Sequence, residues 1–163
     1  MEKIASFQIN HLRLKPGVYV SRKDHFGENQ AEGVTITTFD LRFKEPNKEP
    51  VMDIPAMHTI EHLAATFLRS HGEWGSRIVY FGPMGCRTGF YLIVEGDHVS
   101  ADVLPLLCEM LDWAEQFDGP IPGASAEECG NWREQNIEMA KWECRRYAAL
   151  LKNPSPENLK YPE

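Results

Sequence analysis

Residues 57–69, with the sequence MHTIEHLAATFLR, constrain the fold more than any other stretch of this chain. Apolar side chains recur in it at the spacing of one helix face, which predicts an amphipathic helix that begins near Asp53. In such a helix His58 and His62 are one turn apart, so both imidazoles project from the same face, with Glu61 beside them. The H-x-x-E-H pattern therefore predicts a metal clamp with a neighbouring carboxylate.

The alternative is a surface helix that carries two histidines by chance, and a third ligand decides between the two. Candidates for it are Cys129, Cys86, Glu61 and the other histidines. We favour Cys129, because a capping-box pattern at residues 125–128 places it in the first turn of a predicted helix. The helix dipole there favours a thiolate. Two histidines and one cysteine leave one coordination position open, which is typical of catalytic sites.

Cys86 lies in a glycine-rich turn, GPMGC at residues 82–86, between two predicted strands. Two interpretations stay open from spacing alone. Cys86 is a nucleophilic or proton-shuttling thiol, whose pKa the adjacent Arg87 could lower, or it is a small buried hydrophobe. For Cys108 and Cys144 we expect packing roles only.

The pattern of elements predicts an α+β fold with a mostly antiparallel four-stranded sheet. Two strands are expected in residues 17–44, joined by a loop at 24–33, and two more at 77–81 and 89–94. A second helix, from about residue 101 to 119, carries an apolar stripe that packs on the sheet. Arg42 falls on the face opposite the aromatic residues of its strand, where a lone arginine is expected to be solvated. We expect a tail beyond residue 153 that is loosely held.

Length and charge limit the function. The 163 residues suffice for one well-buried core, so we expect a single domain over residues 1–163. The net charge of -7 and the lack of a cluster of Lys and Arg argue against nucleic acid as a partner. We expect no membrane segment and a cytoplasmic location, because the N-terminus lacks the apolar run of a secretory signal and charged residues and a proline interrupt the most apolar helix, around residues 101–114. The four cysteines lack C-x-x-C spacing, which in a reducing compartment favours free thiols, metal ligation or catalysis over disulfides.

Five sequence blocks, taken together and in order, resemble the S-ribosylhomocysteine lyases of the LuxS family. They cover nearly the whole chain: SFQINH at 6–11, FDLRF at 39–43 with PNK at 46–48, HTIEHL at 58–63, FGPMGCRTGFYL at 81–92 and ECGN at 128–131. The resemblance implies a homodimer with active sites at the subunit interface, each subunit being a sheet with helices on one side. It also implies one divalent metal per subunit, natively Fe(II), which zinc or cobalt can replace.

The resemblance further assigns roles to single residues. It implies that His58, His62 and Cys129 hold the metal, that Cys86 and Glu61 act as acids and bases, and that Ser6, His11 and Arg42 hold the ribose portion of the substrate. The reaction is then a metal-assisted migration of the sugar carbonyl followed by β-elimination. It cleaves S-ribosylhomocysteine to homocysteine and 4,5-dihydroxy-2,3-pentanedione.

One position departs from the family pattern. Tyr80 stands where many members carry an acidic residue that is thought to meet the amino group of the homocysteine portion. Two other functions compete with the lyase. An H-x-x-E-H metallopeptidase would use Glu61 to activate water and needs an acidic third ligand, and a copper electron carrier with two His and one Cys ligand has no catalytic task. The peptidase gives no role to Cys86, and the copper carrier leaves the sequence blocks with Ser6, His11 and Arg42 unexplained.

Overall fold

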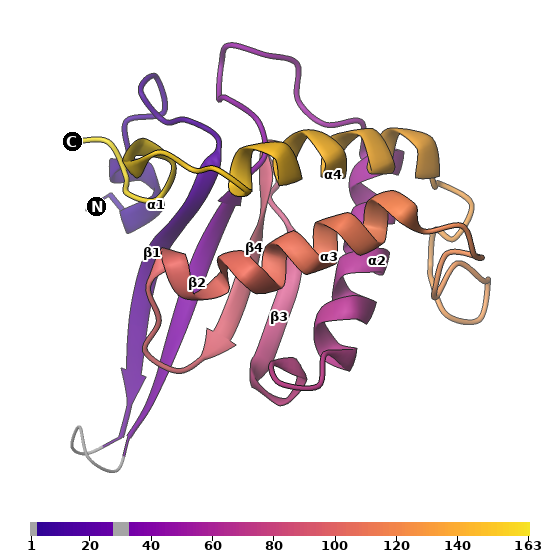
Figure 1. The fold of residues 1–163 in the computed structure, drawn as a ribbon, viewed down its shortest axis with the longest axis horizontal. Coiled ribbons are helices and arrows are strands. Elements are labelled where there is room, and N and C mark those ends of the chain that lie inside the picture. Colours follow the sequence, from indigo (N-terminus) through magenta and orange to yellow (C-terminus); the bar gives the residue numbers. More distant parts are fainter. Residues whose placement is uncertain (1–2, 28–32) are drawn as a thin grey trace.

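The computed structural model describes residues 3–27 and 33–163, so residues 28–32 of the predicted loop lie outside the described part. Its centre is a four-stranded sheet in the order β1-β2-β4-β3, in which every neighbouring pair is antiparallel (Figure 1). The strands are β1 (Gly17–Phe26), β2 (Val34–Arg42), β3 (Ile78–Pro83) and β4 (Gly89–Glu95). The predicted four-stranded sheet is confirmed.

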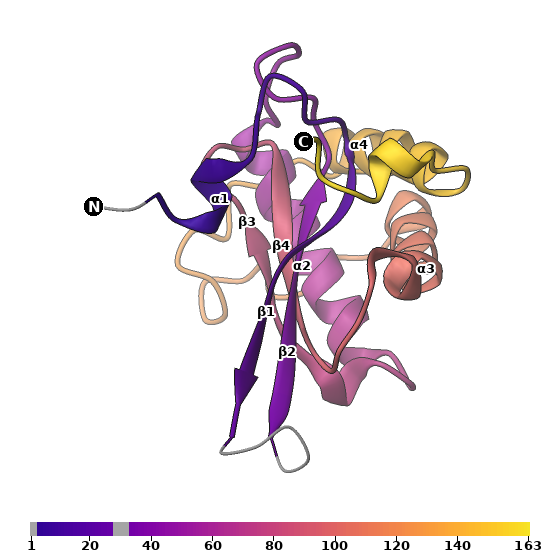
Figure 2. The same cartoon turned by 90° about the vertical axis from the view of Figure 1, so that its left-hand side faces the viewer.

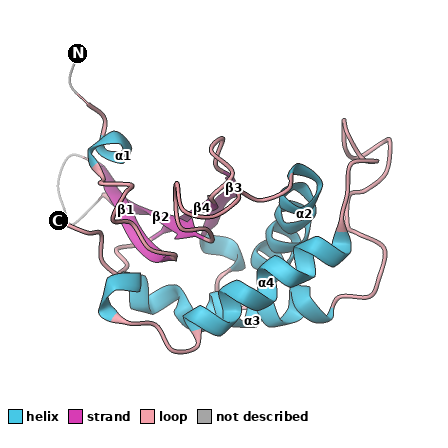
Figure 3. Ribbon diagram, turned by 90° about the horizontal axis from the view of Figure 1, so that it is seen from above, coloured by secondary structure: helices cyan, strands magenta, loops and turns pink. Residues whose placement is uncertain are grey.

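Three long helices cover one side of the sheet, and a short one lies on the other side (Figures 2 and 3). The long helices are α2 (Ile54–Ser70), α3 (Leu104–Gln116) and α4 (Ile137–Leu151), and the short one is α1 (Ala5–Gln8). Single turns of 3-10 helix stand at Gly75–Arg77, Ser100–Val103 and Pro156–Asn158. This arrangement confirms the α+β class with its helices packed on one face.

The alternation of β2 gives the sheet two buried faces of different chemistry. Phe39 and Leu41 are fully buried and join the hydrophobic core beneath the long helices. The alternate residues point to the other face and are also buried: Thr38, Asp40 and Arg42 are only 8%, 2% and 4% exposed. The prediction that Arg42 is solvated is therefore wrong: an ion pair with Asp40 and the chain segments that cover this face enclose it.

The last long helix begins later than predicted. Residues 125–134 form turns, and α4 starts after Asn136, whose side chain accepts a hydrogen bond from the backbone N–H of Met139 at 3.1 Å. A single helical turn does close at Ser125, where the Cys129 N–H donates to the Ser125 carbonyl at 3.0 Å. Gly130 follows at once, and the turn does not continue into a helix.

The C-terminal segment is tied down, in contrast to the loose tail expected from the sequence. The Asn158 side chain donates to the carbonyl of Pro16 at 2.8 Å, and the Ser100 hydroxyl donates to that of Leu159 at 3.0 Å. The buried Tyr19 phenol donates to the carbonyl of Glu157 at 3.0 Å. These bonds hold the segment beside β1. Among the described residues, none of the helices has both the length and the apolar character to cross a membrane.

Candidate active site

The two histidines of the H-x-x-E-H pattern meet Cys129 at one point. Ile60, Leu63 and Ala64 bury one face of α2 in the core, which leaves His58 and His62 on the partly exposed face. The Nε2 atoms of the histidines are 3.0 Å apart, and the Cys129 Sγ is 3.4 Å from the Nε2 of His58. All three ligand atoms lie within 4.8 Å of one another.

Backbone carbonyls fix the orientation of both imidazoles. The Nδ1 of His58 lies 2.9 Å from the carbonyl of Glu134, and the Nδ1 of His62 lies 2.6 Å from that of Pro122. A carbonyl only accepts, so each Nδ1 carries the proton and each Nε2 is left with a lone pair. Two lone pairs and a thiol sulfur thus converge at one point.

This donor set fits a divalent transition metal. Ligands about 2.0 to 2.3 Å from a tetrahedral ion stand roughly 3.3 to 3.8 Å apart, close to the 3.0 and 3.4 Å that separate the His58 Nε2 from the other two atoms. Two imidazoles and one thiolate suit zinc, cobalt and iron better than magnesium or calcium, which prefer oxygen. The carbonyl partners of Nδ1 complete the outer shell that metal-binding histidines normally have.

Cys129 reaches the site from an irregular segment and not from the start of a helix. The prediction that a helix dipole stabilises its thiolate is therefore wrong, although its place beside the histidines is as expected. The segment is docked on α2 by Thr59, whose hydroxyl donates to the Gln135 side chain at 2.7 Å and accepts from the Asn136 N–H at 2.9 Å. Gly123, with a φ of +70°, lies so near His62 that a Cβ there would stand 3.1 Å from Nδ1.

A second group of predicted residues lines a cavity of about 320 Å³ on the face of the sheet opposite the long helices. Ser6, His11, Arg42 and Cys86 all contribute to its wall. The His11 Nδ1 lies 2.8 Å from the carbonyl of Ile9, so its Nε2 is left as an acceptor for a hydroxyl group. The four residues come from α1, the segment after it, β2 and the turn between β3 and β4.

Cys86 is exposed, which excludes the small buried hydrophobe. Partial burial in the cavity raises the pKa of its thiol, but hydrogen bonds from Thr88 and the charge of Arg42 outweigh this effect, so the net pKa is lowered. The Thr88 Oγ1 is 3.1 Å from the Cys86 sulfur and accepts from the Arg42 Nη1 at 2.5 Å. The cation that acts on the thiol is thus Arg42 from β2, and not the adjacent Arg87 that the sequence suggested.

The other two cysteines contrast with Cys86. Burial raises the pKa of Cys108, and it raises that of Cys144 to about 12. Both thiols are therefore protonated at neutral pH and unsuited to proton transfer. The expected packing roles agree with this result.

The structure does not bring all predicted site residues together within one chain. Ser6 lies on α1, and Cys129 lies in the connection between α3 and α4, at the opposite end of the molecule (Figures 1 and 3). None of the three metal-ligand candidates lines the Cys86 cavity. Glu61, which is next to His62 on α2, does not line it either. Within the described part of the chain, the candidate residues therefore form two separate groups, the His-His-Cys group and the Cys86 cavity.

Three residues that contact Cys86 or Arg42, or line their cavity, were not predicted from the sequence. Thr88 lies two residues after Cys86 and bonds to it, and Asp40 lies two residues before Arg42 and pairs with it at 2.5 Å. Tyr161, near the C-terminus, also lines the cavity. The period of two along β2 could have pointed to Asp40, whereas nothing in the sequence near Tyr161 indicates its contact with the sheet.

Cys129→Ala should weaken Co²⁺ binding more than about 100-fold, because outer-shell changes alone cost roughly 10 to 100-fold. The thiolate-to-cobalt absorption band, followed in an anaerobic titration, should disappear. Cys108→Ala is the matched control and should keep the band. A Cys129→Ala protein that retains both band and affinity would rule out this ligand set.

Thr88→Val should raise the pKa of Cys86 by about one unit, since a hydrogen bond to a charged group contributes ~1.5 to 3 kcal/mol and the exposed thiol realises only part of it. The pKa is read from the pH dependence of Cys86 alkylation by iodoacetamide, resolved by peptide mass spectrometry. Thr35→Val, at the far end of β2, should leave the profile unchanged. Equal profiles for all three proteins would contradict the role given to Thr88.

Comparison with known proteins identifies the family of the chain. A model of the S-ribosylhomocysteinase (LuxS) family matches residues 4–157. The chain is 57% identical over 163 residues to the S-ribosylhomocysteine lyase of Clostridium acetobutylicum, with both chains covered completely. It is 53% identical over 162 residues to that of Borreliella burgdorferi, covering 99% of this chain and 100% of the relative, and 51% identical to that of Porphyromonas gingivalis, with both fully covered. The chain therefore belongs to the LuxS family of S-ribosylhomocysteinases.

Proposed function

We propose that residues 1–163 form one metal-dependent domain that cleaves S-ribosylhomocysteine to homocysteine and 4,5-dihydroxy-2,3-pentanedione. The observation that carries this proposal is a thiol of lowered pKa in a cavity that Ser6, His11 and Arg42 also line, in a chain that holds a His-His-Cys group as well. We assign the protein to the cytoplasm, where reducing conditions keep its four cysteines free.

His58, His62 and Cys129 would hold one divalent metal per subunit, with Fe(II) expected natively and zinc or cobalt as possible replacements. When bound, such an ion supplies a Lewis acid that makes C–H bonds next to a sugar carbonyl more acidic. The carbonyl partners of the two Nδ1 atoms keep both imidazoles in the tautomer that this task requires.

Proton transfer falls to Cys86 and Glu61. As a thiolate, Cys86 takes a proton from one sugar carbon and returns it to the neighbouring one, while Glu61 serves the oxygen atoms. Two such transfers move the carbonyl from C1 to C3. A proton is then lost from C4, the C5–S bond breaks, and homocysteine leaves as the thiol after protonation. Ser6, His11 and Arg42 hold the ribose portion during these steps.

The separation between the His-His-Cys group and the Cys86 cavity supports a homodimer with shared active sites. A single chain does not bring α1 and the α3–α4 connection together, so a second copy would bring its Cys86 cavity to the metal group of the first (Figure 1). Apolar side chains around the cavity suit such an interface. Ile4 and Phe7, beside and on α1, are 60% and 70% exposed, and Tyr80 on β3 is 45% exposed.

The metallopeptidase and the copper carrier lack comparable support. A peptidase of the H-x-x-E-H type needs an acidic third ligand, whereas the third group near the histidines is the sulfur of Cys129. Neither rival uses the thiol of Cys86 or the residues that lower its pKa. The relatives named above are all S-ribosylhomocysteine lyases.

Anaerobically prepared protein should release free thiol from S-ribosylhomocysteine, and Cys86→Ala should slow this release by about 10² to 10⁴-fold, the usual contribution of one general acid-base group. Metal content should stay unchanged. Cys108→Ala serves as the control and should keep full activity. No thiol release by the metal-loaded wild type would refute the lyase, and full activity of Cys86→Ala would refute the role of this thiol.

Mixing inactive Cys86→Ala and His62→Ala subunits should restore activity if each site combines two chains. Random reassociation gives mixed dimers with one intact site, hence about a quarter of the wild-type activity per subunit. The mixture is assayed for thiol release after partial denaturation and refolding, beside each variant treated alone. Failure to regain activity, with mixed dimers demonstrated by mass spectrometry, would argue that each site lies within one chain.

A further inference from the structure

The C-terminal segment places one side chain inside the network behind Cys86. Tyr161 stacks on Tyr19 with ring centroids 4.7 Å apart, and its hydroxyl donates to the Oδ2 of Asp40 at 2.9 Å. The same oxygen accepts from the Arg42 Nη2 at 2.5 Å. Because Arg42 also bonds to Thr88, which contacts Cys86, an unbroken chain of hydrogen bonds runs from Tyr161 to the thiol.

We propose that Tyr161 is a positioning residue for the reaction, acting through Asp40 to hold the guanidinium of Arg42 against Thr88 and Cys86. The inference rests on the proposed function in one respect only, namely that Cys86 transfers protons. Tyr161 itself touches no reacting atom in this scheme. It works by fixing the carboxylate on which Arg42 is anchored.

The Asp40–Arg42 ion pair, to which Tyr161 donates, has unsatisfied hydrogen-bonding atoms. Asp40 and Arg42 are almost completely buried, yet among the described residues the Oδ1 of Asp40 and the Nε of Arg42 have no hydrogen-bond partner. Loss of the Tyr161 hydroxyl would leave Asp40 with Arg42 as its one described side-chain donor. The carboxylate would then draw the guanidinium toward itself and away from Thr88, because an undersatisfied buried charge binds its remaining partner more strongly.

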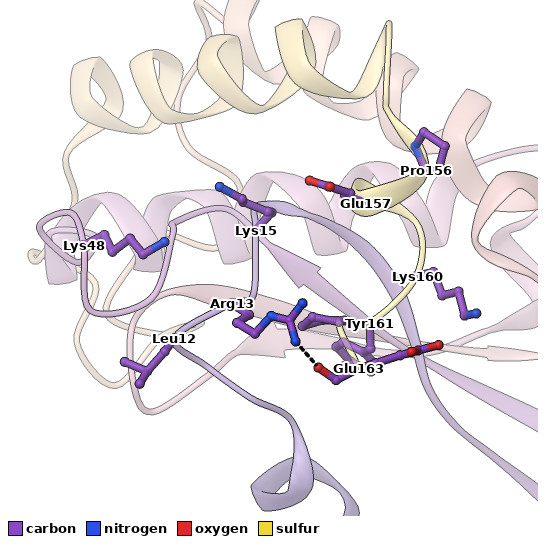
Figure 4. A pocket seen from close by; sticks show the side chains of 10 residues that line it. Leu12, Arg13, Lys15, Lys48, Pro156, Glu157, Lys160, Tyr161 and Glu163 are labelled. Atoms are coloured by element: carbon purple, nitrogen blue, oxygen red, sulfur yellow. Dashed lines mark hydrogen bonds between the residues drawn. The ribbon is translucent and has the colours of Figure 1, made fainter.

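Tyr161 is suited to this task by its chemistry and by its anchoring. Burial and the neighbouring Asp40 carboxylate raise the pKa of its phenol, so the hydroxyl keeps its proton and donates. The residues around it are fixed to the body of the protein. Figure 4 shows Arg13 donating to the main-chain oxygen of Glu163, at 2.7 Å, next to Tyr161.

Other groups that face Cys86 do not change when the phenol hydroxyl is removed. The titratable and charged side chains that line its cavity are His11, Asp40, Arg42, Tyr91 and Tyr161, and Arg87 follows it in the chain. Tyr161→Phe alters no charge at neutral pH and keeps the aromatic ring that stacks on Tyr19. A change in the acidity of Cys86 in this variant would therefore report on the position of Arg42.

The experiment measures the pH dependence of Cys86 alkylation by iodoacetamide in the full-length protein, resolved by peptide mass spectrometry. Tyr161→Phe should shift the profile upward by about half a pH unit, which lowers the thiolate fraction at neutral pH roughly threefold. Tyr147→Phe is the matched control, because it removes a buried phenol that donates to the Gly17 carbonyl at 2.6 Å on the helical side of the sheet. It should lower stability and leave the profile in place.

A Tyr161→Phe profile equal to that of the wild type, or an equal shift in Tyr147→Phe, would overturn the proposal. Tyr161→Leu, which also removes the stacked ring, should shift the profile at least as far as Tyr161→Phe, and its failure to do so would likewise count against the role. Alkylation requires no substrate, so this result is independent of the lyase assay. If the lyase is correct, the acid limb of kcat/KM against pH should move by the same amount.

Discussion

The imidazoles of His58 and His62 are fixed in two ways. The hydrophobic core holds α2, the helix that carries them, and two backbone carbonyls of one irregular segment bind their Nδ1 atoms. Each of the two attachments would be insufficient alone. The core sets the direction of α2 but leaves the imidazole rings free to rotate, whereas the carbonyls of Pro122 and Glu134 select one tautomer and one ring orientation. The same segment carries Cys129, and its docking on Thr59 places the sulfur beside the two imidazoles.

On the opposite side of the sheet, the surroundings of Cys86 lower the pKa of its thiol although the cavity partly desolvates it. Burial of Cys86 in its cavity acts against the thiolate, so the protein must supply a compensating charge close by. That charge, Arg42, is itself buried and needs Asp40 to offset its desolvation. The buried polar groups of this face therefore depend on one another for hydrogen bonds and opposite charges. Their chain of contacts runs from Thr88 through Arg42 and Asp40 to Tyr161 in the C-terminal segment.

Much of this arrangement was accessible from the sequence, because it depends on periodicity. The clamp of His58 and His62, the sheet and its helical layer follow from spacing of apolar and polar residues, and the family resemblance supplies the site residues. The start of α4 was not accessible, since a capping box at residues 125–128 resembles a helix start and only the docking of the following segment on α2 decides otherwise. The sequence also suggested the wrong cation for Cys86, namely the adjacent Arg87. Pairing of β2 with β4 instead brings the guanidinium of Arg42 to the Cys86 sulfur.

The residues on the two faces of β2 should tolerate different kinds of substitution. Phe39 and Leu41 fill the core, and exchanges there are limited by volume and tolerate any apolar side chain of similar size. Asp40 and Arg42 meet polar groups beside both chain ends, where shape matters less than charge and the number of donors. Evolutionary drift at the end of this strand should therefore alternate from one residue to the next, with conservative apolar replacements at Phe39 and Leu41 and near-invariance at Asp40 and Arg42.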